Sequence, residues 1–335
     1  MLGRNVNISK IAELAGVGKA TVSRVLNNKP NVSPKTAAKV REVCNVVGYK
    51  PNFFASNIMN VQTNIIGLFF EAGNDQYYKY YGDLLEGCIT EAHRYGMQVL
   101  PYFSPDVNML HEILTPGKSP LAGALILAPN VQEHRLVQLE KYKIPYAIIG
   151  VLYGETRKYP RVDVDNRKLV YDSLNYLYER GHRRIGFVNS LPKLTISRER
   201  EKAVQTFLEN NADLNIIERF CSDCEGTAGE VIESIMKENA NITAFIVASD
   251  IMAKDVYEYC GKRNLQIGKD ISVLALGGTK YTQILTPKLT CAVQDYAEIG
   301  KAAVRLLESR FDGSCGEECK YFESHIVTGD SVGRR

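Results

Sequence analysis

The amino-acid sequence predicts two structural classes in one chain: an all-α helix-turn-helix head, and an α/β body of two parallel-sheet subdomains with a cleft between them. Charge predicts the head, because the first 60 residues carry nine bases and two acids, while the rest carries 32 bases and 36 acids. The alternation of short apolar runs with helical stretches predicts the body, since it is typical of parallel sheets covered by helices. A chain of 335 residues is long enough for two or three domains.

Composition restricts the classes of protein to consider. Hydrophobic residues make up 45% of the chain and charged residues 24%, which is ordinary for a globular protein. No apolar run approaches the ~18 residues of a membrane helix. The N-terminal stretch MLGRNVNISK lacks the apolar core of a signal peptide. We therefore expect a cytoplasmic protein with no membrane partner.

The eight cysteines are spread along the chain, and we expect most of them to be reduced thiols. The alternative is a zinc or redox site, because Cys221-x-x-Cys224 and Cys315-x-x-x-Cys319 have the spacing of zinc half-sites. The sequence contains no P-loop, nucleophile elbow or metal-ligand helix. We therefore expect no cofactor, no metal and no catalytic residue.

Three short helices are expected in the head. The apolar positions of the first are Ile8, Ile11, Leu14 and Ala15. Asn7 is a suitable N-cap, and the glycines of 16–18 end this helix before a second one at Lys19–Leu26. Ser33 and Pro34 have the residue types of an N-cap and a first helical position, so a third helix begins there. Two helices joined by a tight glycine turn form a helix-turn-helix.

The second helix is the one expected to enter the major groove of DNA. Its outward residues are Lys19, Ala20, Thr21, Ser23 and Arg24, and Asn27 follows at its end. Arg and Lys pair with guanine edges, and Ala or a Thr methyl meets the thymine methyl. Ser, Thr and Asn more often hold phosphates. The alternative, a helical hairpin that only packs on a neighbour, leaves the excess of basic residues unexplained.

A continuous stretch from Asn7 to Ala55 contains GVGKATVSRVLNN and then VSPKTAAKVREVCNVVGYKPNFFA. This stretch closely resembles the lactose/galactose repressor (LacI/GalR) family of bacterial transcription regulators. The resemblance implies a helix-turn-helix DNA-binding domain over residues 1–50, followed by a hinge helix and linker over residues 51–62.

The hinge is expected to be a short helix that Asn52 caps. In the family this segment folds on the operator and pushes an apolar side chain into the minor groove, where such wedges kink DNA. The resemblance assigns the wedge to Ile58, with Met59 beside it. The alternative is that Phe54, Ile58 and Met59 belong to the core of the following domain.

The body is expected to alternate strands and helices from Thr63 onward. The expected strands are Ile65–Phe70, Gln98–Tyr102, Gly123–Ala128, Tyr146–Ile149, Ile185–Asn189, Ala244–Ala248 and Ser272–Leu276. The expected helices are Gly82–Tyr95, Gln132–Tyr142, Asn166–Arg180, Ser197–Asn210, Thr227–Glu238, Asp250–Asn264 and Tyr296–Arg310. Ligands of such folds bind at the carboxyl ends of the strands.

The same family resemblance extends over the body. Its motifs include GALILAP, VDVDN, RGHRRIGFV, SDIMA and VTGDSVGR. It implies a periplasmic-binding-protein-like domain over residues 63–335 that binds an effector and dimerises. The expected N-subdomain is about 63–161 and 291–321, the expected C-subdomain is about 162–290 and 322–335, and crossovers are expected near 161–162, 289–292 and 321–323.

The loop after the first strand, EAGNDQYYKYYG, is rich in tyrosine. The resemblance places Tyr80 and Tyr81 where two phenylalanines are common, and Tyr77 precedes them. A tyrosine offers a flat apolar face and a hydroxyl, which suits a sugar ring. The alternative is that some of these rings pack as core.

The resemblance also assigns Arg200, Ser249, Asp250 and Gln294 to the effector cleft. A guanidinium suits hydroxyls or charges because its donors are fixed in one plane. LALGGT places glycines at 277 and 278, where many members have an acidic pair, and trehalose-type regulators are similar there. This favours a disaccharide, with or without a phosphate. The bases available for a phosphate are Lys193, Arg198, Arg200 and Lys280.

We predict a sequence-specific DNA-binding transcriptional regulator, a repressor of carbohydrate-utilisation genes controlled by a small sugar or sugar-phosphate effector. A homodimer would read a near-palindromic operator, because two-fold symmetry of the protein requires it in the site. One alternative is the same fold acting with a corepressor ligand or a partner protein. Another is a sugar-binding protein or an enzyme, but Asp163 and Asp165 are interpreted as strand-end residues rather than catalytic carboxylates.

Overall fold

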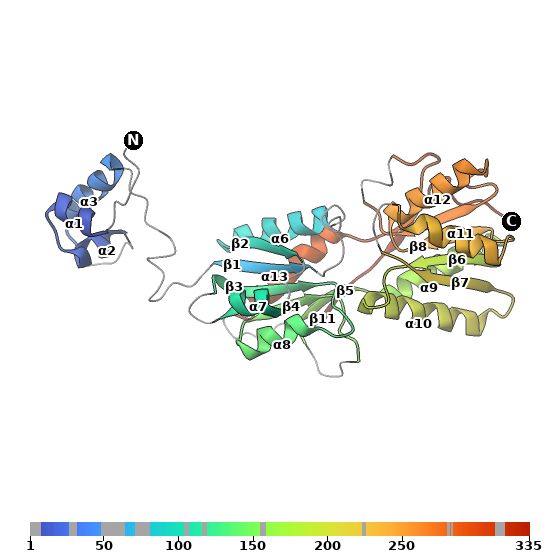
Figure 1. Cartoon of the computed structure of the whole chain (residues 1–335), viewed down its shortest axis with the longest axis horizontal. Helices are drawn as coiled ribbons and strands as arrows, with labels where there is room; N and C mark the ends of the chain where they lie inside the picture. The colour runs from blue at the N-terminus through green and yellow to red at the C-terminus, as the bar shows by residue number, and fades with distance from the viewer. Residues whose placement is uncertain are drawn as a thin grey trace. The chain divides into compact units, whose positions relative to one another are not determined.

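The protein divides into two compact units, residues 1–62 and residues 63–335, and each is described by itself (Figure 1). The computed structural model describes residues 8–26, 32–47, 64–70, 81–103, 107–115, 119–154, 159–222, 226–279, 282, 284–311 and 319–335. The predicted hinge helix, with Asn52, Ile58 and Met59, lies outside these residues. No helix within them is long and apolar enough to cross a membrane.

The head has the three helices predicted from its sequence. They are α1 (Ile8–Ala15), α2 (Lys19–Leu26) and α3 (Pro34–Val46). The start of α3 is as predicted, because Pro34 is its first residue and the Ser33 hydroxyl accepts a hydrogen bond of 3.1 Å from the Thr36 amide. The buried side chains that join the helices are Ile11, Ala12, Ala15, Val22, Val25, Val40 and Cys44.

One predicted core position in the head is wrong. Leu14 is 47% exposed, whereas Ala12 is buried. Residues 8, 11, 12 and 15 form the i, i+3, i+4, i+7 stripe of one helix face, and position 14 lies off that stripe. The small Ala12 side chain contributes to the core instead.

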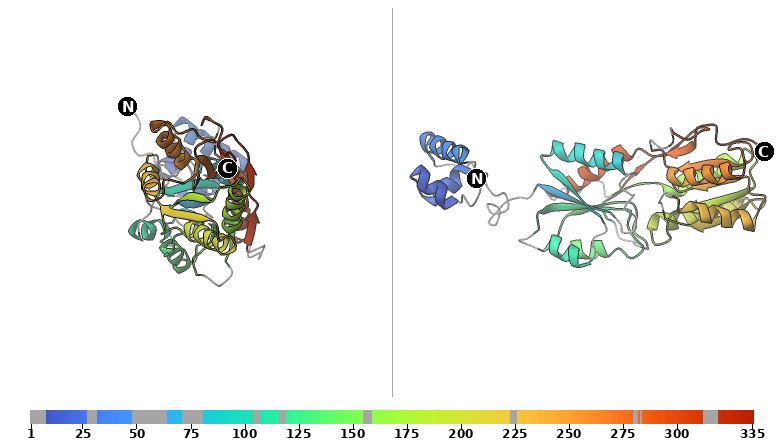
Figure 2. Two further views of the ribbon diagram at one scale, coloured as in Figure 1. Left: turned by 90° about the vertical axis from the view of Figure 1, so that its right-hand side faces the viewer. Right: turned by 45° about the horizontal axis from the view of Figure 1, so that its top comes forward.

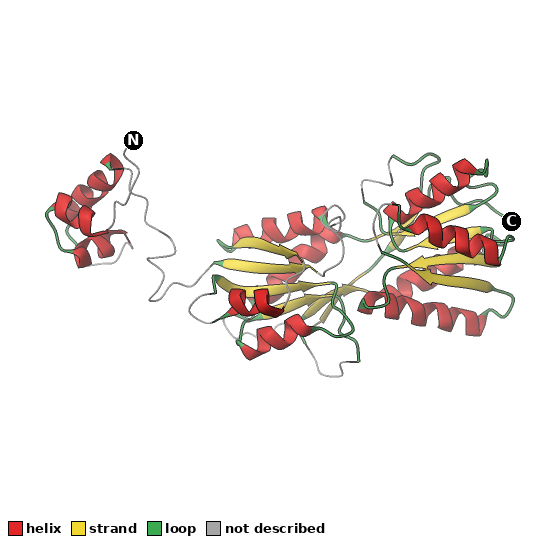
Figure 3. Cartoon of the chain, viewed as in Figure 1, coloured by secondary structure: helices red, strands yellow, loops and turns green. Residues whose placement is uncertain are grey.

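The body contains two six-stranded sheets (Figure 3). The first has the strand order β11-β5-β4-β3-β1-β2, and all its pairs are parallel. Its strands are β1 (Ile65–Phe70), β2 (Gln98–Phe103), β3 (Leu121–Leu127), β4 (Tyr146–Ile149), β5 (Arg161–Val164) and β11 (Cys319–Phe322). The second has the order β12-β10-β9-β8-β6-β7, and only β12 is antiparallel to its neighbour. Its strands are β6 (Arg184–Asn189), β7 (Asn215–Phe220), β8 (Ala244–Val247), β9 (Ser272–Leu276), β10 (Thr290–Val293) and β12 (His325–Val327).

Helices cover both faces of each sheet, as the alternating pattern predicts (Figure 2). The first sheet packs on α6 (Gly82–Arg94) and α13 (Tyr296–Glu308) on one face, and on α7 (Val107–Leu114) and α8 (His134–Lys141) on the other. The second packs on α9 (Asn166–Tyr178) and α10 (Thr195–Asn210), and on α11 (Ala228–Glu238) and α12 (Asp250–Lys262). Almost every side chain of the central strands β1, β3, β8 and β9 is buried, so these strands are runs of apolar residues.

The chain crosses between the sheets later than the sequence suggested at the first two crossovers. Strand β5 pairs with β4 and β11, so the first crossover follows Val164 instead of lying near 161–162. Strand β10 pairs with β9, so the second follows Val293 instead of lying at 289–292. The third lies between Phe322 and His325. Neither β5 nor β10 is among the strands expected from the sequence.

Candidate functional site

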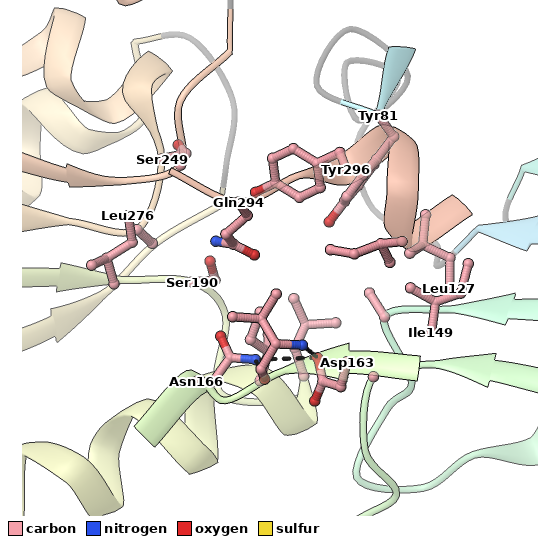
Figure 4. A pocket seen from close by; sticks show the side chains of 18 of the residues that line it. Tyr81, Leu127, Ile149, Asp163, Asn166, Ser190, Ser249, Leu276, Gln294 and Tyr296 are labelled. Carbon is pink, nitrogen blue, oxygen red and sulfur yellow. Dashed lines mark hydrogen bonds between the residues drawn. The ribbon is translucent and has the colours of Figure 1, made fainter. Parts of the chain in front are cut away.

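The body has a cavity between the carboxyl ends of its two sheets (Figure 4). It encloses about 950 Å³, counting the open space at its mouth. Side chains that follow β3, β4 and β5 line it from the first sheet, and side chains that follow β6, β8, β9 and β10 line it from the second. The parallel topology brings these positions together, because parallel strands end at the same edge of a sheet.

Five of the seven residues predicted for the effector cleft line this one cavity. They are Tyr81, Arg200, Ser249, Asp250 and Gln294. Tyr77 and Tyr80 lie outside the described residues. The five residues come from four separate segments of the chain, with Ser249 and Asp250 adjacent at the start of α12, so the fold brings them together.

Asp250 and Thr279 form the most constrained polar contact of the cavity. The Thr279 amide and hydroxyl both donate to Asp250 Oδ2, at 3.0 and 2.5 Å. Ser249 caps α12, since its hydroxyl accepts a 3.4 Å bond from the Met252 amide. Asp250 is 1% exposed, and burial raises the pKa of its carboxyl. Its second oxygen, Oδ1, is buried and has no hydrogen-bond partner among the described residues.

Two amide side chains at the cavity have the same kind of unsatisfied atom. The Asn166 amide nitrogen donates to Asp163 Oδ1 at 3.4 Å and to the Val164 carbonyl at 3.1 Å, which leaves Asn166 Oδ1 without a partner in the described part of the chain. Gln294 Nε2 is likewise buried without one, and its amide lies near the middle of the view in Figure 4. Buried polar groups are nearly always hydrogen-bonded, so each such atom needs an explanation. A ligand hydroxyl supplies one.

Asp163 is a cavity residue that was interpreted as a plain strand-end residue. It is buried near the end of β5, and burial raises the pKa of its carboxyl to about 7. The positive charges of Arg161 and Arg200 oppose that rise. Asp165 differs, because its carboxylate accepts a 2.9 Å bond from the Lys168 amide and caps α9. The two acids of VDVDN therefore have separate roles.

Aromatic rings border the cavity from the first subdomain. Tyr81 and Tyr296 meet edge to face, with ring centroids 6.3 Å apart and planes at 88°. Both hydroxyls point toward the cavity in Figure 4. Tyr296, Ser190, Asn166 and Thr279 were not predicted as site residues. Ser190 directly follows β6 and Thr279 comes shortly after β9, so the strand-end rule was the signal that could have found them.

Among the described residues, the charge of the cavity lining is not that of a phosphate site. Arg200 is the only base among the described residues that line it, and Asp163 and Asp250 contribute two carboxyls. Arg198 pairs with Glu201 at 3.0 Å, and Lys193 does not line the cavity. Lys280 lies outside the described residues. Of the four bases suggested for a phosphate, the described cavity therefore contains one.

Five of the residues predicted to contact DNA lie on α2, and all five are at least partly exposed. Lys19, Ala20 and Arg24 are exposed, and Thr21 and Ser23 are half-buried. The opposite face of α2 packs into the head through Val22 and Val25. Asn27 lies outside the described residues.

Comparisons with known proteins assign both units to one family. The model for bacterial regulatory proteins of the lacI family matches residues 7–52, and the model for a periplasmic binding protein-like domain matches residues 174–332. The HTH-type transcriptional regulator AglR of Rhizobium meliloti (strain 1021) is 30% identical over 278 residues, covering 81% of this chain and 77% of that protein. Catabolite control protein A of Priestia megaterium is 27% identical over 311 residues, covering 90% and 92%.

The fold is also shared with a solved structure. The lac repressor dimer bound to operator and the anti-inducer ONPF has a TM-score of 0.82 and 21% identity, covering 98% of this chain and 99% of that chain. The head, the two-sheet body and the AglR match lead to one conclusion. The chain belongs to the lacI family of bacterial regulatory proteins, and it is a DNA-binding transcriptional regulator rather than an enzyme.

Proposed function

We propose that this regulator is a repressor whose affinity for operator DNA is set by a neutral sugar of about disaccharide size. A homodimer presents two α2 helices to a near-palindromic operator in the cytoplasm. The sugar occupies the cavity between the two sheets. The observation that carries the proposal is that three buried polar atoms of the cavity lining have no partner among the described residues: Asp250 Oδ1, Asn166 Oδ1 and Gln294 Nε2.

Those atoms fit a polyhydroxylated ligand. Each sugar hydroxyl donates one hydrogen bond and accepts others, so it satisfies both acceptors and donors. Asp250 and Asn166 offer acceptors, while Gln294 and the guanidinium of Arg200 offer donors. The rings of Tyr81 and Tyr296 add flat apolar faces with a hydroxyl at the edge.

Charge favours a neutral sugar over a sugar phosphate. A phosphate brings up to two negative charges into a site that already has the carboxyls of Asp163 and Asp250 against one guanidinium. Strong phosphate sites bring together several positively charged hydrogen-bond donors. A protein of the same fold supports control by a ligand, since the lac repressor was crystallised as a dimer bound to operator and the anti-inducer ONPF.

The cavity is placed to couple ligand binding to DNA binding. Its walls come from both sheets, so a bound sugar favours one angle between the two subdomains over others. The effector changes DNA affinity only by the difference in its own affinity for the two states, typically about 1–3 kcal/mol. The sign of that change separates an inducer from a corepressor.

The test has two stages. The purified protein first selects its DNA from a pool of random duplexes, and this selected DNA becomes the probe. Glucose, maltose, cellobiose, trehalose, sucrose and trehalose 6-phosphate are then titrated one by one by calorimetry and by DNA-binding anisotropy. We expect a neutral disaccharide to bind and to shift DNA affinity. Tight binding of trehalose 6-phosphate alone contradicts the neutral-sugar assignment, and a sugar that binds without changing DNA affinity contradicts the effector role.

A further inference from the structure

Two segments far apart in the sequence join the subdomains beside the cavity. Residues 129–131 come shortly after β3 of the first sheet, and residues 193–195 lead into α10 on the second, with Thr195 the first residue of that helix. The Val131 amide donates to the Lys193 carbonyl at 2.8 Å, and the Thr195 amide donates to the Pro129 carbonyl at 3.1 Å. Asn130 and Leu194 therefore face each other as an antiparallel pair. We call these two segments the latch.

The latch is part of the cavity rim. Ala128 and Pro129 line the cavity on one side of it, and Leu194 and Thr195 line the cavity on the other. The Thr195 hydroxyl adds a second bond of 3.0 Å to the Pro129 carbonyl. Arg200 lies further along the same helix, α10, that begins at Thr195. A ligand in the cavity thus contacts residues on both sides of the latch.

A buried ion pair holds the first segment of the latch in shape. The side chains of Arg135 and Glu133 are 1% and 5% exposed, and Arg135 Nη2 lies 2.5 Å from Glu133 Oε2. Arg135 also donates to the carbonyls of Phe69 and Leu127, at 3.1 and 3.4 Å, and these carbonyls end β1 and β3. Glu133 accepts a 3.0 Å bond from the Asn130 amide, inside the latch. The pair therefore ties the ends of two strands to the latch.

The backbone entering the latch is held in an unusual conformation. Ala128 has φ of +47°, the left-handed region that costs free energy for a residue with a side chain. Its amide donates to the Ile149 carbonyl at 3.1 Å, so the neighbouring strand supports this conformation. Buried ion pairs contribute little net stability compared with apolar packing, so the Arg135–Glu133 pair is better explained by a role in fixing the geometry of the latch.

We propose that Arg135 and Glu133 are positioning residues for the effector response: they hold Asn130 in the latch, and the latch keeps the two walls of the cavity facing each other. The sugar binds the latched state more tightly because only this state offers both walls. The sugar part of this inference rests on the proposed function. The latch itself is tested without a sugar.

The pairing of Asn130 with Leu194 permits a direct test by a disulfide. The two flanking hydrogen bonds define a non-hydrogen-bonded antiparallel pair, whose Cα atoms lie about 4.5 Å apart. That separation is within the range for a disulfide. The variant Asn130→Cys with Leu194→Cys is oxidised, and wild type treated with the same oxidant is the control for the native thiols. Failure of the bond to form overturns the latch geometry.

The oxidised and reduced forms of this double variant are compared for affinity to the selected DNA without sugar. We expect oxidation alone to shift DNA affinity by the factor that saturating sugar produces in wild type, and dithiothreitol to reverse the shift. Equal DNA affinity of the two forms overturns the proposal. If no sugar binds wild type, the proposed function fails, and the redox dependence of DNA affinity still decides whether the latch controls the head.

A second pair of variants tests the hydrogen bond without a cross-link. Val131→Pro removes the amide that donates to Lys193, and Val131→Ala keeps it as the matched control. We expect Val131→Pro to weaken affinity for the disaccharide identified above by about five-fold, the factor of one backbone hydrogen bond. Hydrogen exchange is the readout that needs no ligand. We expect residues 193–195 to exchange faster in Val131→Pro than in Val131→Ala. Unchanged exchange and affinity contradict the latch.

The hydrogen bond from the Asn130 amide to Glu133 is tested by Glu133→Ala and its conservative counterpart Glu133→Gln. The glutamine keeps an acceptor for the Asn130 amide, and alanine does not. We expect Glu133→Ala to have the same effects as Val131→Pro, namely faster hydrogen exchange in residues 193–195 and weaker sugar affinity. We expect Glu133→Gln to keep both properties at the wild-type level. If Glu133→Ala does not fold, the Val131 variants carry the test. A folded Glu133→Ala protein with wild-type exchange in residues 193–195 overturns the positioning role.

Discussion

Thr279 donates both its backbone amide and its hydroxyl to one oxygen of the Asp250 carboxylate, at 3.0 and 2.5 Å, and leaves the other oxygen inside the cavity wall. This relationship fixes which face of the carboxylate a ligand meets. It also explains how a buried acid is tolerated next to a glycine-containing turn.

Asp250→Asn is expected to weaken binding of the disaccharide by about ten-fold or more. Thr279 keeps its acceptor, so the amide nitrogen of the new side chain faces the cavity and offers a donor where the sugar meets an acceptor. Hydrogen bonds to charged groups contribute about 1.5–3 kcal/mol. Calorimetric titration measures the affinity.

Thermal unfolding is the control for Asp250→Asn. Because burial raises the pKa of the native carboxyl, the charged form disfavours folding near pH 7, and the neutral variant is expected to unfold at the same or a higher temperature. A folded variant that binds the sugar as tightly as wild type contradicts the assignment of Asp250 Oδ1 to a sugar hydroxyl.

The stability of the body is expected to fall between about pH 4 and pH 7 through Asp163. Burial raises the pKa of this carboxyl to about 7, above its unfolded value of 3.8, so the native state binds the proton more tightly. Stability from such a group is present below the unfolded pKa and is lost as pH rises through the native pKa. The full loss is at most about 4 kcal/mol.

Asp163→Asn isolates this contribution. Glu218, with its pKa also raised to about 7 by burial, and His182, with its pKa lowered to about 4 by burial, titrate in both proteins and cancel in the comparison. Unfolding temperatures from pH 5 to pH 8 are the measurement. The curve of Asp163→Asn is expected to fall less steeply than that of wild type. Parallel curves show that Asp163 does not titrate in this range.

Arg24→Ala is expected to weaken binding to the selected DNA by about ten-fold or more and to leave disaccharide affinity unchanged. Arg24 is an exposed base on the outer face of α2, where a guanidinium reaches base edges or phosphates. A lost base contact relaxes sequence preference at one position, whereas a lost phosphate contact lowers the salt slope by about 1. Lys35→Ala on α3, which also removes one positive charge from the head, is the matched control. Equal effects of the two variants contradict a specific role for Arg24.

The two glycines after β9 are expected to differ in their tolerance of alanine. Gly278 has φ of +152°, and a Cβ there would lie 2.8 Å from Val293 Cγ2. At Gly277 the nearest atom to a Cβ is the Asp250 nitrogen, 3.9 Å away. Gly278→Ala is therefore expected to lower the free energy of unfolding by about 1–3 kcal/mol. Gly277→Ala is the matched control in thermal or urea unfolding, and equal stabilities contradict this account of the turn.

Much of the fold could be predicted from the sequence because its long elements carry strong local signals. The central strands β1, β3, β8 and β9 are apolar runs that were found within a few residues of their ends. The strands β7, β11 and β12 were missed, as were β5 and β10, whose sequences RVDV and TCAV include polar residues and so form no continuous apolar run. Their absence moved the expected crossovers toward the N-terminus.

The sequence predicted only those site residues whose type at a given position matches the family resemblance. Arg200 and Asp250 were expected from the family resemblance, and both line the cavity. Asn166 and Ser190 are common residue types, and only the sheet topology shows that each faces the cavity. The latch was beyond sequence reasoning, because nothing in residues 129–131 indicates a partner in residues 193–195.

The most direct test of the account compares DNA affinity with and without the effector in wild type and in Arg200→Ala. Anisotropy of the selected DNA is measured at zero and saturating concentrations of the disaccharide. We predict a shift of about 5–150-fold in wild type. We predict that Arg200→Ala binds the DNA normally without sugar and shows no shift at the same sugar concentration. A full shift in Arg200→Ala contradicts control of the head through this cavity.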